Sequence, residues 1–176
     1  MILANTNLGH ALGVSTAAAA WCVIATAAHA DLRVSFQEGA PKDRFEIRNI
    51  GSCTITGASV VIDLSQSQGG LIFDVTSAGQ GTQVFQPFEI VQGADALARV
   101  PTVVDGQNRV ALEITRLAPD ANIAFTIDVD DTLGQRATTV TGAEIAGATV
   151  SYNSGAIPVL ATFANGPRTV IPIPDC

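Results

Sequence analysis

Short runs that alternate apolar and polar residues, separated by turn residues, dominate this sequence after its first thirty residues. In Leu32–Phe36 the apolar side chains Leu32, Val34 and Phe36 occupy every second position, and the same alternation returns in Phe45–Arg48. A period of two is the repeat of a β-strand with one buried face, because successive side chains point to opposite sides of the sheet. The chain is therefore constrained to fold from short strands rather than helices.

Turn residues such as Gly69-Gly70 and Asn165-Gly166-Pro167 separate these runs, and only Asp95–Ala98 could form a helical turn. The spacing predicts about ten or eleven strands in a single antiparallel β-sandwich of immunoglobulin-like type, an all-β domain covering residues 31–176. Twelve segments are the candidates for these ten or eleven strands: Leu32–Phe36, Phe45–Arg48, Ile55–Leu64, Leu71–Val75, Gln83–Val91, Arg99–Val104, Arg109–Leu117, Ile123–Val129, Ala137–Val140, Ala148–Tyr152, Ile157–Phe163 and Thr169–Ile173.

The first thirty residues predict a secretory signal peptide. The apolar run Ala17–His29 is too short for the roughly twenty residues of a membrane-spanning helix, and it ends in the small-x-small site Ala28-His29-Ala30. No Lys or Arg precedes the run, which departs from the usual signal pattern. We expect cleavage after Ala30 and export of Asp31–Cys176 to the periplasm, cell surface or extracellular space, with no membrane span.

Removing this segment also removes most of the reactive residue types. Both histidines, the only Trp and the only Met lie within it, whereas all nine Lys+Arg and all sixteen Asp+Glu lie beyond it. Nucleophilic sites that use an imidazole base and histidine-ligated metal sites are therefore excluded from the exported chain. A net charge of −7 with a single Lys argues against nucleic acid as a partner. These absences favour a binding protein over an enzyme.

Cys53 and Cys176 are the two cysteines that remain after export. Disulfides persist outside the cytoplasm, so the simplest expectation is one bridge between them. A redox-active pair is the alternative, but the two residues lack the close spacing that lowers a thiol pKa.

Oxygen ligands are the chemistry that this chain does offer. In the run Ile123–Asp131 the apolar residues alternate toward the core, so Asp128 and Asp130 project together from the other face and Asp131 follows at the turn. Three neighbouring carboxylates repel one another, and a hard divalent cation relieves that repulsion. Calcium accepts six to eight oxygens in loose geometry, so we predict a calcium site here.

Other acidic residues are candidates to complete the ligand shell. The predicted metal ligands beyond the run at 128–131 are Asp74, Glu89 and Glu144, with Asp63 and Asp105 as further acids nearby in the expected fold. Acids on outward-facing strand positions are more often plain solvated surface, so each assignment carries that alternative.

Several of these segments resemble a known family. The stretches Phe45–Gly51, Val61–Leu64, Gly70–Val75, Val84–Glu89 and Phe125–Thr132 look like those of small secreted bacterial proteins, the aggregation factor core proteins. The family takes its name from the core protein of the sponge aggregation factor, a calcium-dependent cell-adhesion proteoglycan. The resemblance implies an adhesion or matrix role with calcium.

The leading hypothesis is therefore a secreted, non-enzymatic adhesion or extracellular-matrix type protein that uses calcium and binds a cell-surface or matrix protein, a glycan, or itself. A calcium-assisted glycan-binding module is one alternative, although the chain has a single Tyr, Tyr152, for stacking on sugar rings. A hydrolase with two carboxylates, such as Asp74 and Glu89, is the other.

Overall fold

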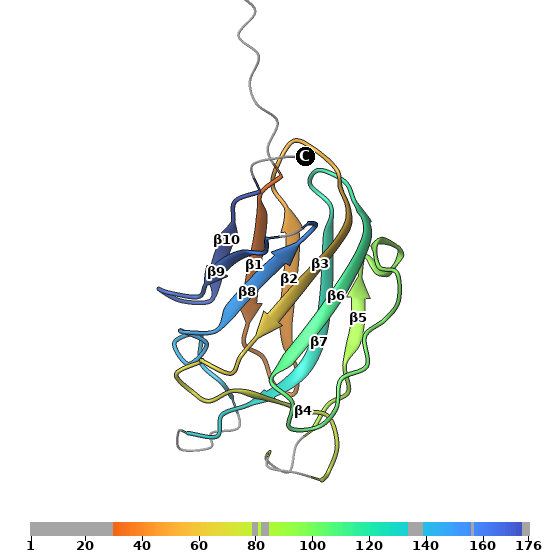
Figure 1. The fold of residues 1–176 in the computed structure, drawn as a ribbon. Helices are drawn as coiled ribbons and strands as arrows, with labels where there is room; N and C mark the ends of the chain where they lie inside the picture. The colour runs from red at the N-terminus through yellow and green to blue at the C-terminus, as the bar shows by residue number, and fades with distance from the viewer. Residues whose placement is uncertain (1–29, 79–80, 82–84, 134–138, 156, 174–176) are drawn as a thin grey trace, which may run out of the picture.

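The computed structural model describes residues 30–78, 81, 85–133, 139–155 and 157–173. These residues form ten strands and one short 3-10 helix, η1 (Ala94–Ala96), with no α-helix among them (Figure 1). The strands are β1 (Leu32–Gln37), β2 (Asp43–Asn49), β3 (Ile55–Asp63), β4 (Ile72–Asp74), β5 (Glu89–Gln92), β6 (Arg109–Leu117), β7 (Asn122–Asp130), β8 (Thr149–Asn153), β9 (Val159–Thr162) and β10 (Arg168–Ile171).

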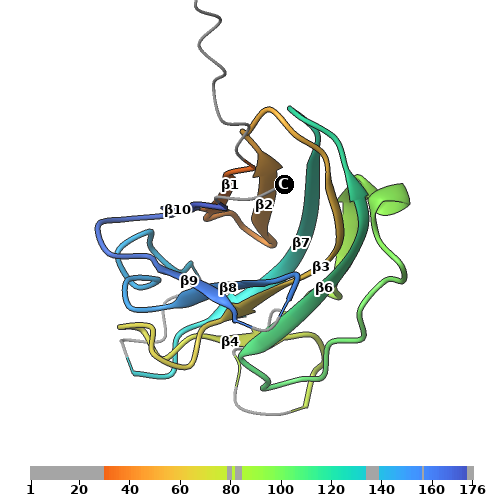
Figure 2. The same ribbon diagram turned by 45° about the horizontal axis from the view of Figure 1, so that its top comes forward.

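Two antiparallel sheets make up the fold. The first has six strands in the order β10-β1-β2-β7-β4, with β5 also paired to β7, and the second has four in the order β6-β3-β8-β9. β4 and β5 follow one another along the same edge of β7, since they pair with residues 128–130 and 124–126 respectively. Figure 2 shows the two sheets curving around a shared interior, and one hydrophobic cluster draws on both. The all-β, sandwich-like architecture expected from the alternation is confirmed.

Aromatic side chains form the centre of the six-stranded sheet's inner face. The register sets Phe36 opposite Phe45 and Phe45 opposite Phe125. Ring centroids in both pairs lie 5.0 Å apart, and Phe73 of β4 meets Phe45 edge-on at 6.5 Å. Aromatic pairs in these offset and edge-on arrangements stabilise a core beyond their buried area. Four strands are thus fixed side by side through one row of rings.

The expected segments match the observed strands closely, with two exceptions in the described part. Arg99–Val104 was expected to be a strand, and this prediction is wrong, because Pro101 lacks a donor and residues 98–108 form hydrogen bonds with two different strands instead. Within Gln83–Val91 the strand begins only at Glu89. The helical turn expected at Asp95–Ala98 is present as η1, and the Ala137–Val140 prediction falls partly outside the described residues.

The described chain begins at Ala30, which is buried and donates its N–H to the carbonyl of Ile173. Asp31 follows, and its carbonyl accepts the N–H of Ile50, close in sequence to Cys53. The end of the described chain therefore lies near the turn that carries Cys53. Cys176 is outside the described residues, so the Cys53–Cys176 bridge stays a prediction, as does the signal peptide.

A buried amide joins the end of β2 to the end of β6. Asn49 is fully buried, and its Nδ2 donates to the carbonyls of Cys53 (2.8 Å) and Leu117 (3.1 Å). Its Oδ1 accepts the N–H of Gly51 at 3.0 Å. Asn49 thus links the two sheets through its hydrogen bond to Leu117 and fixes the turn after β2 through the other two.

We expect Asn49→Ala to lower the free energy of unfolding by about 3 kcal/mol, because buried carbonyls and an N–H are left without partners. Urea unfolding of the variant measures this loss. Asn165→Ala, at an exposed turn residue, serves as the matched control and should change stability by less than about 0.5 kcal/mol. Equal midpoints for the two variants would contradict the structural role given to Asn49.

Candidate functional site

Three buried aspartates meet where β4 pairs with β7. Asp128 and Asp130 lie on β7, and the register places Asp74 of β4 opposite Asp128. All three are less than one-tenth exposed. Their neighbours in the alternation, Phe73 and Val129, belong to the hydrophobic core, so the aspartates lie on the opposite face of the sheet. We call Asp74, Asp128 and Asp130 the carboxylate cluster.

Main chain from outside these strands packs over the cluster. A Cβ at Gly81 would overlap Oδ2 of Asp74 and lie 2.7 Å from Oδ2 of Asp130, so only glycine fits at this position. Gln86 donates its N–H to the Asp74 carbonyl (3.2 Å), and its own carbonyl accepts the N–H of Asp128 (3.4 Å). The residues before β5 therefore cover carboxylates that the alternation alone would leave in solvent.

Of the three carboxylates, Asp74 has the least favourable environment for a negative charge. It is 1% exposed, and neither of its carboxylate oxygens accepts a hydrogen bond. Burial raises the pKa of Asp74 to about 7, and the hydrogen bonding and negative charge of the neighbouring Asp105 and Asp130 carboxyls also raise it. Burial likewise raises the pKa of Asp128 to about 7, assisted by the charges of Asp130 and Asp43. An ionised cluster is therefore unfavourable until a positive charge or protons compensate it.

Asp105 approaches the cluster from the loop that precedes β6. Its Oδ1 accepts the N–H groups of Val75 (2.9 Å) and Thr76 (3.0 Å). Burial acts to raise the pKa of Asp105, but these two hydrogen bonds, together with side-chain hydrogen bonding to Asp74 and Thr76, hold the pKa below its usual value. An ionised carboxylate is thus fixed beside Asp74.

Asp43, which the sequence analysis did not select, is buried beside the cluster at the start of β2. Its Oδ1 accepts the N–H of Gly39 and its Oδ2 that of Val129, each at 3.0 Å. Burial raises the pKa of Asp43 to about 7, although both hydrogen bonds oppose the shift. The alternation of β2 contained the signal, since Asp43 has the same parity as the core residues Phe45 and Ile47.

The remaining predicted ligands are dispersed. Asp131 follows the last residue of β7, is buried, and both its carboxylate oxygens lack hydrogen-bond partners. Glu89 is mostly exposed and pairs with Lys42. Glu144 accepts hydrogen bonds from the N–H and hydroxyl of Thr141. In the described part of the chain, the structure records no contact between Glu89 or Glu144 and the cluster.

The cluster offers oxygen ligands but does not form a complete metal coordination shell. Among the described residues, no three acidic side chains are arranged so that they could hold a metal ion as they stand. Carboxylates on adjacent strands can turn toward a common ion by side-chain rotation, and backbone carbonyls and water complete the six to eight oxygens of calcium. Without an ion, the raised pKa values of Asp74 and Asp128 show that protons are taken up instead.

Comparisons of the chain with protein-family models, curated proteins and solved structures found no match. The part of the chain that the structure describes contains no helix with the length and apolar character to cross a bilayer.

In a calcium-free buffer we expect the melting temperature to fall as the pH rises from about 5 to about 8. The folded pKa values of Asp43, Asp74 and Asp128 are about 7, against an ordinary aspartate pKa of 3.8. The folded state therefore holds more protons in this window, and its stability is lost as the pH rises through 7. Asp63 and Asp105 have lowered pKa values, so their titration changes the stability only below this pH window. Thermal unfolding in EDTA measures the slope.

Asp74→Asn tests the cause of that slope. The amide cannot ionise, so the variant should melt above wild type at pH 8 and show a shallower pH dependence. Glu89→Gln, which removes an exposed charge, should follow the wild-type curve. A wild-type melting temperature that is flat or rises over this range would contradict the assignment.

Proposed function

We propose that this protein is a secreted, non-enzymatic adhesion or matrix protein whose association depends on calcium bound at the carboxylate cluster. The observation that carries the proposal is Asp74, a buried carboxylate that accepts no hydrogen bond, lies opposite Asp128 and interacts with the charge of Asp130. The resemblance to the aggregation factor core proteins supports the same role. The proposal includes an immunoglobulin-like sandwich, export through the segment ending at Ala30, and a Cys53–Cys176 bridge.

Calcium suits this cluster better than a smaller ion. Magnesium requires near-ideal octahedral geometry and gives up its water reluctantly, whereas calcium tolerates irregular sets of carboxylate and carbonyl oxygens. The aspartates are held on two paired strands, so their main chain cannot rearrange into a compact cage. A loose shell of side-chain, main-chain and water oxygens is what this arrangement can supply.

A hydrolase built on Asp74 and Glu89 has less support. Asp74 is buried at the β4–β7 pair, whereas Glu89 lies on exposed β5 and pairs with Lys42. Carboxylates that act together on a glycosidic bond flank the same bond from about 5 to 10 Å apart. The ion pair with Lys42 directs Glu89 to a different neighbour.

Titration calorimetry should detect calcium binding with a Kd of about 0.1–1 mM, the range of extracellular calcium modules. Asp130→Asn should weaken binding by at least about tenfold, because it removes one anionic ligand from the centre of the cluster. Asp74→Asn should do the same and thereby connect binding to the buried carboxylate.

Glu89→Gln is the matched control, since it removes an acid that was predicted as a ligand but lies outside the cluster. It should bind calcium as wild type does. No binding heat up to about 5 mM calcium, or equal losses in all three variants, would remove calcium from the proposed function.

The adhesion step can be tested with beads coated with the protein. We expect the beads to cluster in about 2 mM calcium and to disperse in EDTA, with Asp130→Asn beads remaining dispersed in both. A glycan array run with and without EDTA separates the alternative partner. Calcium-dependent glycan binding without bead clustering would favour the glycan-binding module. The absence of both glycan binding and bead clustering would contradict an adhesive role.

A further inference from the structure

The four-stranded sheet ends at β6, and one stretch of that edge is open. β3 pairs with β6 along its length on one side. On the other side, Leu97 forms an antiparallel bridge with Ile114, and Ala98 donates its N–H to the carbonyl of Glu113 at 2.8 Å. The chain then leaves the edge, so the stretch Arg109–Leu112 has no strand beside it among the described residues.

The direction of the main chain follows from two hydrogen bonds. Leu64 donates its N–H to the carbonyl of Asn108, so the main-chain N–H and carbonyl groups of residues 108, 110 and 112 point toward β3. The carbonyl of Glu113 points away from β3, toward Ala98. Antiparallel strands alternate in this way along each edge. The N–H and carbonyl of Ala111 must therefore point away from β3, and no hydrogen bond within the described part of the chain takes up either group.

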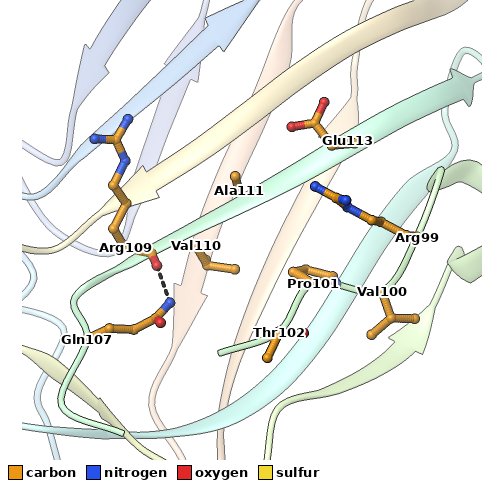
Figure 3. Close-up of a pocket in the computed structure, with 9 residues that line it drawn as sticks. All are labelled: Arg99, Val100, Pro101, Thr102, Gln107, Arg109, Val110, Ala111 and Glu113. Carbon is orange, nitrogen blue, oxygen red and sulfur yellow. Dashed lines mark hydrogen bonds between the residues drawn. The ribbon is translucent and has the colours of Figure 1, made fainter. Parts of the chain in front are cut away.

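A groove of about 620 Å³ runs beside Ala111 (Figure 3). One wall is β6 from Arg109 to Glu113, and the other is the segment Arg99–Thr102. Gln107 closes one end by donating a hydrogen bond from Nε2 to the carbonyl of Arg109. Pockets for small ligands measure roughly 300–1,000 Å³, so the groove has room for a few residues of extended chain.

The charge of the groove differs from that of the whole protein. The chain carries a net charge of −7, yet two of its nine basic residues, Arg99 and Arg109, line this groove with one acid, Glu113. Glu113 already accepts a hydrogen bond from the hydroxyl of Ser59. The ion pairs formed within the described residues do not include Arg99. Arg99 is exposed, and Figure 3 shows its side chain reaching from the Arg99–Thr102 segment toward β6.

We propose that the β6 edge binds an extended peptide segment with an acidic residue, which adds as a strand beside Ala111. The main-chain groups of Ala111 supply the ladder hydrogen bonds, and Leu97–Ala98 already occupies the continuation of the same edge in antiparallel fashion. Val100 and Pro101 contact alternate side chains of the segment, and Arg99 pairs with its carboxylate. Strand addition of this kind draws affinity from the main chain and specificity from such side-chain contacts. This site goes beyond the calcium-dependent function and does not rest on it.

The test uses ¹⁵N-labelled protein and the synthetic peptide acetyl-Thr-Val-Glu-Val-Thr-amide, with the Gln-containing peptide as its uncharged match. We expect saturable shifts of the amide signals of Ala111 and Glu113 with a Kd of about 1 mM or tighter. The Gln peptide should bind about threefold more weakly, as expected for an exposed ion pair. Arg99→Gln should remove that difference.

Ala111→Pro removes the N–H at the centre of the groove wall while leaving the β3–β6 ladder intact, since proline is tolerated on an open edge. It should weaken peptide binding by about tenfold, whereas Ala111→Val, which keeps the N–H, should bind like wild type. Arg99→Gln keeps the proposal testable if the proline variant does not fold.

Three results would overturn the proposal: no shift at these amides at about 10 mM peptide, equal binding of both peptides by wild type, or equal binding by the folded Pro and Val variants. Shifts at the same amides that depend on protein concentration alone would assign the edge to a second copy of the chain instead.

Discussion

The fold depends on β7, a strand that is hydrogen-bonded on both edges and buried on both faces. β2 pairs with one edge, and β4 and β5 share the other. One face contributes Ile123, Phe125, Ile127 and Val129 to the core, and the other carries Asp128 and Asp130. Because pairing on both edges fixes the main chain, both aspartates stay on the covered face of a sheet that the aromatic row holds together. The strand order therefore holds these carboxylates close together at the end of β7, which is unfavourable when they are ionised.

Asp43 and Asp74 are both buried carboxylates, but they differ in the hydrogen bonds that they accept. Burial raises the pKa of each to about 7, but Asp43 accepts two main-chain N–H groups and Asp74 accepts none. Hydrogen-bonded carboxylates are satisfied structural groups, whereas an unpartnered one costs free energy in its ionised form. Asp43 thus serves to tie the turn before β2 to β7. The capacity to take up a cation or a proton lies with Asp74 and its partners.

The sequence allowed part of this to be predicted. Alternation located the strands and placed Asp128 and Asp130 on one face, because both are local properties of a single strand. Asp74 lies opposite Asp128 because of the register of β4 with β7. These strands are far apart in the sequence, since β4 ends at Asp74 and β7 begins at Asn122, so no local pattern encodes their register. The dispersal of Glu89 and Glu144 has the same origin. Asp43 was missed because the expected strand began only at Phe45, two residues after it, although its parity with Phe45 indicated the core.

The failure at Arg99–Val104 has a more specific reason, and it connects the two sites. The segment from Gly93 to Asn108 bonds to β6 through Ala98 and to β4 through Gly106 and Gln107, which exchange hydrogen bonds with Phe73. A stretch anchored on both sheets cannot continue as a strand along either one, so it bows away from β6 between its anchors. The bow leaves the groove at Ala111, and the second anchor brings Asp105 to Asp74. One segment therefore creates the open edge and supplies a charge to the carboxylate cluster.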